Sequence, residues 1–505
     1  DPDNLCARAF IVHLDQFACR WDSFDTNCAE LIEAIRKAAR QADPQGVEST
    51  PFVLAAIPHS PKDFLEAARL EARRLARNAT PLEETTAAAP VPVHRKIRIG
   101  YLSSDFYQHA TAMLFTEVLE RRDTQRFDVY LYSHGPDDKS PMRDRIMKAC
   151  EHFVDVAHLG PRETAERIRQ DDIDILVDLK GYTADNRFAT LAYRPAPVQV
   201  SYLGFPGTTG AEYIDYVIGD PYVTPLEHAS HFSEKIAQMP VCYQPNDRQR
   251  PLPQPSTRQQ WGLPEQGFVF GCFNQAYKII PETFDAWMLI LHAVPGSVLW
   301  LLDGGDQAQI NLRREAEHRG IEGSRLIFGS AIKPEQHISR LSHVDLVLDT
   351  WPYNAHTTAS DALWAGVPVL TLCGETFASR VATSLVHAVG LGDSLVCHSV
   401  EAYAHRAIEL AGNPEVLKRM RAHLASNRHQ APLFDSAACA QGLEALYVRM
   451  HERRCAALPP DHLPAQPIEE RNAPEGGGSS ALPHTEVVAT DDAVQDPHPS
   501  ASAIA

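Results

Sequence analysis

The sequence lacks the long apolar run that marks a membrane-spanning helix. No uninterrupted hydrophobic stretch in its 505 residues approaches the roughly 18 residues that a bilayer requires. Basic residues are also too few for a protein that mainly binds nucleic acid, since 47 Lys and Arg face 65 Asp and Glu, for a formal charge of −18. We therefore expect no membrane span and no nucleic-acid partner.

Paired cysteines are missing as well. None of the ten cysteines forms a C-x-x-C pair, so we expect no structural zinc and no other bound metal. The thiols are scattered, and several lie in apolar runs, which is typical of a reducing compartment and predicts a cytoplasmic protein. Because the first residue is Asp1 rather than Met, we expect the chain to be a fragment with a segment upstream.

The two common phosphate-binding glycine loops are absent. The segment LGFPGTTG at 203–210 has three glycines, but it is neither G-x-G-x-x-G nor a P-loop. This disfavours a dinucleotide oxidoreductase and a phosphate-loop ATPase. The loop favours either close approach of its amides to a ligand or a tight turn, and the sequence leaves both open.

Both ends of the chain differ from its middle. Residues 1–90 have helical patterning, and Ser60-Pro61-Lys62-Asp63 predicts a helix start with Ser60 as N-cap. Residues 456–505 are rich in proline and acidic residues and have no aromatic side chain. We expect the first region to be an α-helical connector and the second a disordered acidic tail.

Short β-branched runs alternate with helical patterns in residues 95–243 and again in 261–455. This alternation predicts two α/β lobes, each a doubly wound parallel sheet with helices on both faces. A Pro-, Gln- and Arg-rich linker, 244–260, separates them. The expected strands are 96–103, 127–133, 173–179, 198–203 and 214–218 in the first lobe, and 268–273, 297–302, 325–328, 345–349 and 368–373 in the second.

A polar segment follows the predicted strand 345–349. His356-Thr357-Thr358 should open a helix that ends at Gly366-Val367-Pro368. A helix N-terminus presents free N–H groups and partial positive charge, which suits a phosphate. Thr358 alone would be read as an N-cap with Asp361 as its acidic partner, but the three residues together at a strand's carboxyl end favour anion binding.

Lys278 and His109 follow the first strand of each lobe. Lys278 lies in FNQAYK, where it could neutralise a departing diphosphate or simply be a solvated surface lysine. His109 ends DFYQH, and we expect it to face Lys278 across a cleft between the lobes. A histidine near neutral pKa could act there as a general base, although a lone histidine is more often structural.

These segments together resemble the O-linked N-acetylglucosamine transferase family, the family-41 glycosyltransferases. The resemblance runs from about Lys96 to Met450 and includes GYLSSDF, YRPAP, LGFPGTTG, FNQAYK, PGSVLWLL, HTTASDALWAGVP and GETFASRVA. The helices before residue 90 resemble the connector that follows the tetratricopeptide repeats of that family, and the short linker resembles bacterial members. The resemblance implies the GT-B architecture.

It also implies the chemistry: N-acetylglucosamine (GlcNAc) moves from UDP-GlcNAc to Ser or Thr hydroxyls of protein acceptors, with inversion and without a metal or other cofactor. By this resemblance Lys278 would hold the diphosphate, with Thr357 and Thr358 beside it and Gln275 at the phosphates. His109 would be the candidate general base.

The rest of the donor would contact other residues. The resemblance implies Asp361 on the ribose, His337 near the uracil and His356 near the donor. The sugar would contact the glycine-rich loop, at Gly204, Pro206 and Thr208. Two alternatives stay open: a Spindly-type O-fucosyltransferase that uses GDP-fucose, and a weakly catalytic protein-interaction module. The segment GETFASR at 374–380 favours the GlcNAc branch.

Overall fold

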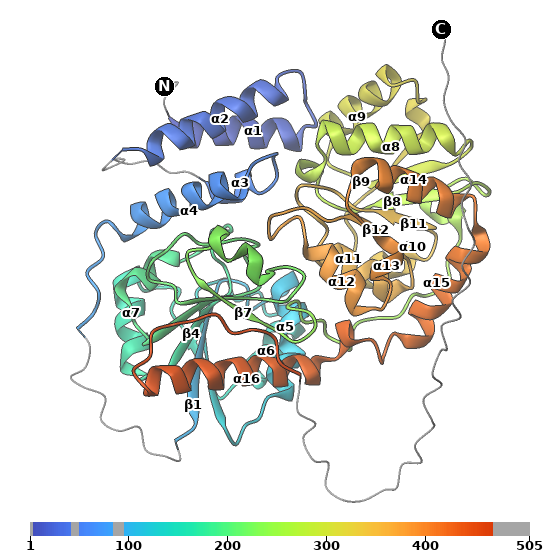
Figure 1. Ribbon diagram of the computed structural model, residues 1–505. Coiled ribbons are helices and arrows are strands. Elements are labelled where there is room, and N and C mark those ends of the chain that lie inside the picture. The colour runs from blue at the N-terminus through green and yellow to red at the C-terminus, as the bar shows by residue number, and fades with distance from the viewer. Residues whose placement is uncertain (1–3, 42–49, 84–94, 468–505) are drawn as a thin grey trace, which may run out of the picture. The chain divides into compact units, whose positions relative to one another are not determined.

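The computed structural model describes residues 4–41, 50–83 and 95–467, and within them two parallel sheets carry the fold (Figure 1). Four helices precede the sheets: α1 (Leu5–Phe17), α2 (Phe24–Ala39), α3 (Pro51–Leu54) and α4 (Pro61–Ala76). The predicted start of α4 is confirmed, because Ser60 Oγ accepts the Asp63 N–H at 3.2 Å and the Asp63 carboxylate returns to the Ser60 N–H. Residues 84–94, at the predicted end of the connector, lie outside the described residues.

The first lobe is built on a seven-stranded parallel sheet in the order β3-β2-β1-β4-β5-β6-β7. Its strands are β1 (Ile97–Ser103), β2 (Phe127–Ser133), β3 (His152–Asp155), β4 (Ile175–Asp178), β5 (Val198–Ser201), β6 (Tyr216–Gly219) and β7 (Lys235–Gln238). Its helices are α5 (Ala110–Arg121), α6 (Pro141–Lys148) and α7 (Pro161–Gln170). The strand order reverses direction between β1 and β4, and such a reversal leaves a crevice at the carboxyl ends of the two strands.

The second lobe repeats this plan with six parallel strands in the order β10-β9-β8-β11-β12-β13. The strands are β8 (Val269–Cys272), β9 (Val298–Leu302), β10 (Leu326–Gly329), β11 (Leu346–Leu348), β12 (Val369–Leu372) and β13 (Val396–Cys397). The helices are α8 (Pro281–Ala293), α9 (Asp306–His318), α10 (Pro334–Leu341), α11 (Thr357–Ala365), α12 (Val381–Ala388), α13 (Gly392–Leu395), α14 (Val400–Ala411) and α15 (Pro414–Asn427). Here the order reverses between β8 and β11. The predicted pair of doubly wound α/β lobes is thereby confirmed.

The last helix departs from the predicted domain boundary. We expected the second lobe to extend to residue 455, but α16 (Ser436–Cys455) crosses back and packs on α5 of the first lobe (Figure 1). Tyr447 Oη lies 3.1 Å from Tyr101 Oη of β1, and both side chains are buried. The helix therefore follows the second lobe in the chain but packs as part of the first lobe.

The first part of the predicted disordered tail, residues 456–467, is ordered. Leu463 is 4% exposed and pairs in parallel with β7: its N–H donates to Ile236 O at 2.8 Å, and its carbonyl accepts the Gln238 N–H at 2.9 Å. Residues 456–467 thus cover an edge strand, where unpaired backbone groups would otherwise face solvent. The remainder of the predicted tail, 468–505, lies outside the described residues.

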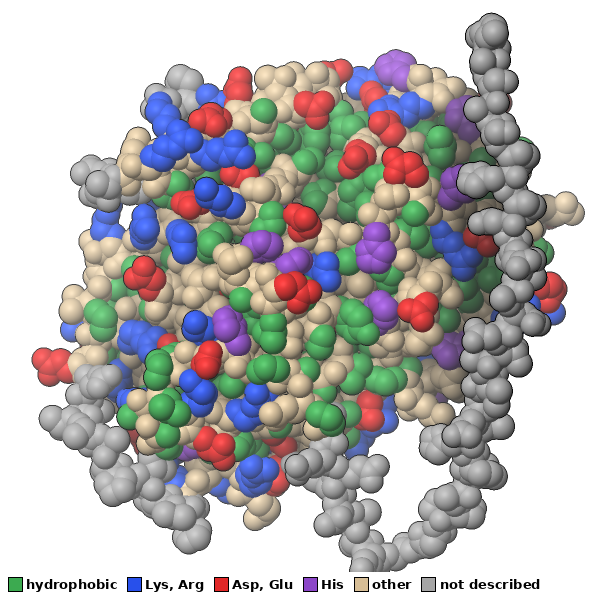
Figure 2. All heavy atoms as spheres, in the orientation of Figure 1, with side chains coloured by type: hydrophobic (Ala, Val, Ile, Leu, Met, Phe, Trp, Pro, Cys, Tyr) green, Lys and Arg blue, Asp and Glu red, His purple; other side chains and the backbone are tan. Residues whose placement is uncertain are grey.

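Three further observations concern membrane spans, cysteines and clusters of metal-ligating side chains. No helix within the described ranges is both long and apolar enough to cross a bilayer. All ten cysteines fall in described segments, and each is a free thiol. Across the same segments, no three His, Cys, Asp or Glu side chains gather in a way that could hold a metal ion. Figure 2 shows several histidine side chains across the middle of the drawn face, among hydrophobic ones.

Candidate active site

Lys278 lies at the strand-order reversal of the second lobe, in the 3₁₀ turn Ala276–Lys278 that follows β8. The side chain is buried, with the residue 8% exposed. Its Nζ donates to Asn354 O at 2.9 Å and lies 3.8 Å from the centre of the Tyr353 ring. Burial lowers the Lys278 pKa to about 8, against the opposing effect of Asp349. A buried cation of this kind can bind an anion strongly.

Asp349 holds the loop that leads from β11 to α11. The residue is fully buried, and its carboxylate accepts hydrogen bonds from Thr350 N–H at 2.8 Å, Ala355 N–H at 2.6 Å and Thr371 Oγ1 at 2.7 Å. Burial nevertheless raises its pKa to about 6. Asp349 was missed as a site residue in the sequence, where it appeared only as the end of a strand. Its signal was a charged residue closing an apolar run.

The predicted helix after this loop is confirmed, and it begins at Thr357. His356 takes the N-cap position, so Thr358 is the second helical residue rather than the cap. Thr358 Oγ1 donates to Asn274 Oδ1 at 2.5 Å, which joins the start of α11 to the segment after β8. The His356 Nε2 atom is buried and has no hydrogen-bond partner among the described residues. Burial holds the His356 pKa well below its usual range. A neutral imidazole and free helix N–H groups therefore lie together.

Asp361 and His337 are brought together, as the predicted nucleoside contacts require. His337 Nε2 lies 3.9 Å from Asp361 Oδ2, and its Nδ1 accepts the Arg340 Nε–H at 3.0 Å. Burial and the Arg340 charge lower the His337 pKa to about 3. Arg250 pairs with Asp361 at 3.1 Å, so the segment predicted as a mere linker supplies a charge to this corner. Gln275 is exposed and directly precedes the 3₁₀ turn that carries Lys278.

His109 lies at the corresponding reversal of the first lobe, between the ends of β1 and β4. It is the N-cap of α5, and its Nδ1 accepts the Thr111 N–H at 3.2 Å. The same ring nitrogen lies 3.4 Å from Asp105 Oδ2, while Asp105 is paired with Lys180 at 2.8 Å. Burial lowers the His109 pKa, so the ring is neutral near pH 7. Within the described residues no contact joins His109 to Lys278, and their predicted opposition stays a prediction.

The glycine-rich loop packs tightly against its surroundings. A Cβ on Gly204 would lie 1.9 Å from Leu179 O, so this position has room only for glycine. The Thr208 hydroxyl donates to Glu234 Oε2 at 2.6 Å and is 2% exposed, which shows that it holds the loop in place. Pro206 and Thr208 both line a cavity.

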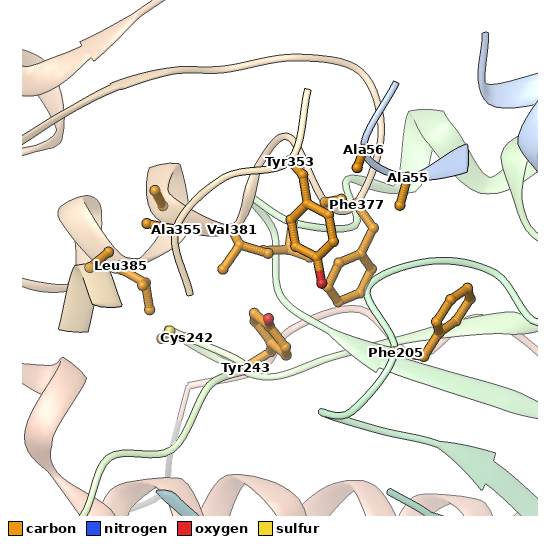
Figure 3. Packing of buried hydrophobic residues seen from close by; sticks show 14 of the residues in the cluster. Ala55, Ala56, Phe205, Cys242, Tyr243, Tyr353, Ala355, Phe377, Val381 and Leu385 are labelled. Atoms are coloured by element: carbon orange, nitrogen blue, oxygen red, sulfur yellow. The ribbon is translucent and has the colours of Figure 1, made fainter. Parts of the chain in front are cut away.

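That cavity lies where the connector and the two lobes meet. Its lining includes Ala55 and Phe64 of the connector, Phe232 of the first lobe and Phe377 of the second. Figure 3 shows the convergence, with Ala55 and Ala56 beside Phe377 and with Phe205 entering from the first lobe.

His59 of the connector also lines the cavity and was missed in the sequence. Its Nδ1 lies 2.7 Å from Ile57 O, and because a carbonyl only accepts, Nδ1 carries the proton. The Nε2 atom then carries the lone pair and can accept a hydrogen bond. It is buried, and no described residue donates to it. Burial lowers the His59 pKa, which keeps the ring neutral. The only sequence signal was its place directly before the Ser60-Pro61 helix start.

Two doubly wound lobes with buried polar clusters at their reversal points define the GT-B class of glycosyltransferases. Comparison with known proteins gives the particular family: the pattern of glycosyl transferase family 41 matches residues 79–254 and 252–443, and the chain belongs to this family. A mutant O-GlcNAc transferase of Thermobaculum terrenum has a similar structure, with a TM-score of 0.79 at 30% identity, over 90% of this chain and 86% of that one.

Curated relatives extend the same finding. The chain is 38% identical over 467 residues to the Arabidopsis thaliana protein named probable UDP-N-acetylglucosamine–peptide N-acetylglucosaminyltransferase SEC, covering 90% of this chain and 48% of that protein. It is 28% identical to the Caenorhabditis elegans UDP-N-acetylglucosamine–peptide N-acetylglucosaminyltransferase, covering 89% and 49%. The chain is 33% identical to the Arabidopsis thaliana protein named probable UDP-N-acetylglucosamine–peptide N-acetylglucosaminyltransferase SPINDLY, covering 72% of this chain and 40% of that protein. The chain therefore spans about half the length of the curated relatives it matches.

Proposed function

We propose that this chain transfers GlcNAc from UDP-GlcNAc to Ser or Thr hydroxyls of protein acceptors, with inversion at the anomeric carbon. The observation that carries the proposal is the buried Lys278 ammonium beside the start of α11, which no carboxylate contacts within the described residues. The relatives named for UDP-N-acetylglucosamine–peptide transfer support the choice of donor and acceptor.

In the proposed reaction the acceptor oxygen bonds to the anomeric carbon as the bond from that carbon to the diphosphate oxygen breaks. UDP leaves with the electron pair, and its negative charge grows in the transition state. Lys278 and the free N–H groups at Thr357 and Thr358 supply the opposing positive potential. With that potential in place, we expect the reaction to need no divalent metal.

The remaining donor contacts follow from the same corner of the second lobe. Following the family resemblance, we assign the ribose to Asp361 and the uracil side to His337. The two side chains lie 3.9 Å apart, close enough to contact adjoining parts of one nucleoside. We assign Gln275, which is exposed beside the Lys278 turn, to the phosphates. The buried Nε2 of His356, to which no described residue donates, could accept a hydrogen bond from a hydroxyl or amide of the donor. The sugar would extend toward Gly204, Pro206 and Thr208, at the cavity of the glycine-rich loop.

Two histidines, His109 and His59, are candidates for the general base that removes the proton from the acceptor hydroxyl. His109 Nδ1 is occupied by the Thr111 N–H, so the neutral ring keeps its proton on Nε2 and is a better donor than base. His59 is arranged the other way, with its proton on Nδ1 and a free Nε2 lone pair at the cavity. We infer that His59 accepts the proton from the acceptor hydroxyl, directly or through one water, and that His109 donates to the sugar or acceptor.

The test is mass spectrometry of Ser- and Thr-containing peptides after incubation with UDP-GlcNAc or with GDP-fucose. Peptides should gain a HexNAc mass with the first donor only, and the gain should be lost with Lys278→Ala. A deoxyhexose gain with GDP-fucose would replace the proposal by the O-fucosyltransferase alternative. No gain with either donor, from a chain that is folded by circular dichroism, would leave the protein-interaction alternative.

A further inference from the structure

Gln16 of α1 is fully buried at the junction between the connector and the second lobe. Its side-chain amide nitrogen donates two hydrogen bonds, to Ala56 O at 2.7 Å and to Tyr277 O at 3.0 Å. Both acceptors belong to buried residues. A carboxamide has two N–H donors, so these two carbonyls satisfy its whole donor capacity.

Each of the two carbonyls adjoins a residue of the proposed site. Ala56 precedes Ile57, whose carbonyl fixes the His59 ring at 2.7 Å. Tyr277 directly precedes Lys278 in the 3₁₀ turn Ala276–Lys278. The two segments come from distant parts of the sequence, and one side chain joins them.

A chain of aromatic contacts also connects α1 with Lys278. The Tyr277 ring lies 5.2 Å from His13 and 5.1 Å from Phe17, both on α1, and 6.2 Å from Tyr353. Tyr353 is the ring against which the Lys278 ammonium rests. Figure 3 shows Tyr353 beside the connector segment that carries Ala55 and Ala56.

We propose that Gln16 is a positioning residue of the transferase, which fixes the His59 segment and the Lys278 turn at one mutual distance by donating to Ala56 O and Tyr277 O. The proposal rests on the proposed function. It makes α1 part of the catalytic apparatus, so that a displacement of this helix would reach the proton acceptor and the diphosphate cation together.

Asn311 offers a matched control at the same junction. Its side-chain amide donates to Ala18 O at 2.8 Å, so it too joins the connector to the second lobe through a buried carboxamide. Ala18 lies on neither the His59 segment nor the Lys278 turn, and its neighbour Cys19 reaches that turn only through a long thiol contact to Ala276 O, at 3.8 Å. Asn311→Leu and Gln16→Met each remove the N–H donors while roughly preserving side-chain volume.

The experiment compares steady-state kinetics and thermal melting of the full chain with both variants. Both should melt a few degrees below the wild type, because each leaves buried carbonyls unpaired. Only Gln16→Met should lower kcat, by about tenfold or more, since small misplacements of reacting groups are costly, while the donor KM should rise several-fold at most. A kcat at least threefold below that of Asn311→Leu supports the proposal, and a smaller difference overturns it.

Two further measurements keep the test decisive. If Gln16→Met does not fold, Gln16→Asn is judged by the same criterion, because its shorter arm keeps the donors but cannot span both carbonyls. If the wild type transfers no sugar, the proposed function fails by itself, and calorimetric titration with UDP replaces kcat. Gln16→Met should then bind UDP several-fold more weakly than Asn311→Leu does, and equal affinities overturn the positioning role.

Discussion

The two lobes place the same pair of residue types at the same point of the same fold, and they use it differently. Each has a buried aspartate and a buried lysine where its strand order reverses. In the first lobe Lys180 pairs directly with Asp105, at 2.8 and 3.0 Å from the two carboxylate oxygens. In the second lobe the Asp349 carboxylate is occupied by Thr350, Ala355 and Thr371, and Lys278 is held by a carbonyl and an aromatic face.

This difference separates a structural cation from a functional one. A buried Lys–Asp pair in contact is neutral as a unit and attracts an incoming anion weakly. A buried ammonium that only a carbonyl and a ring hold keeps its charge available for an anion, at the expense of a lowered pKa. We infer from this comparison that Lys180 serves the fold and that Lys278 serves the proposed transfer reaction.

The largest expected effect is on stability, when Lys180 is replaced. Lys180→Met leaves the Asp105 carboxylate buried with weaker partners, and it should lower the free energy of unfolding by about 3–5 kcal/mol. Denaturant unfolding monitored by circular dichroism measures this. A loss under about 1 kcal/mol, with a large drop in turnover, would assign Lys180 to the chemistry and break the distinction.

Lys278→Ala should show the reverse pattern. Its loss removes the charge that opposes the departing UDP, so kcat should fall by about 10²–10³, equivalent to about 2.7–4 kcal/mol, with a small effect on folding. Steady-state kinetics at saturating donor give the value. Unchanged turnover would return Lys278 to the role of an ordinary buried lysine.

The two histidines sharpen the comparison between connector and first lobe. His59→Ala should lower kcat by about 10² with little change in UDP affinity, because it removes the proton acceptor. It should also abolish the acidic limb of the pH–rate profile, which His109→Ala should retain while its KM rises. If His109→Ala instead loses the acidic limb and His59→Ala keeps it, His109 is the base, which is the role that the family resemblance implies.

The pH dependence of UDP binding reports the Lys278 charge. Burial lowers the Lys278 pKa to about 8, so the cation is present below that pH and is lost as the pH rises through it. UDP affinity should therefore be constant from about pH 7 to 8 and fall by up to about tenfold for each further pH unit. Calorimetric titrations from pH 7 to 9.5 measure the limb, and Lys278→Met should have none.

The smallest expected effect is that of a chelator. UDP should bind equally well with and without EDTA, because Lys278 and the start of α11 provide the positive potential. Loss of affinity on chelation, restored by Mg²⁺ or Mn²⁺, would contradict the metal-independent proposal.

The strands found from the sequence and those missed differ in their position in the sheets. Every predicted run became a strand. Nine of the ten are interior strands, which are buried on both faces and read as continuous apolar runs, and the tenth, β10, lies at a sheet edge. The strands missed were β3, β7 and β13, and all three are edge strands. An edge strand can be short and partly polar, as in His152–Asp155, so its sequence gives no such run.

The candidate site was likewise predicted in part. The start of α11 and Lys278 follow directly after apolar strands, where the topology of a parallel sheet predicts ligand contacts, whereas His337 and Asp361 were named as site residues only through the family resemblance. His59 and Gln16 could not be found in this way. Their importance depends on the connector folding onto the lobes, which local periodicity does not encode.

The sequence by itself determined the alternation of strands and helices, and through the parallel sheet it determined which ends of the strands carry polar residues. Both are consequences of local patterning, because a side chain's face repeats every two residues in a strand and every 3.6 in a helix. The tertiary structure alone decided which lysine is neutralised and which is not. Whether an aspartate contacts its lysine depends on which groups already occupy the carboxylate. Asp349 accepts two N–H groups of its own loop and the Thr371 hydroxyl from β12, whereas the Asp105 carboxylate accepts the Lys180 ammonium, which lies 75 residues away in the sequence. For the same reason the return of α16 to the first lobe, and the link from Gln16 to Tyr277, appear only when the chain is folded.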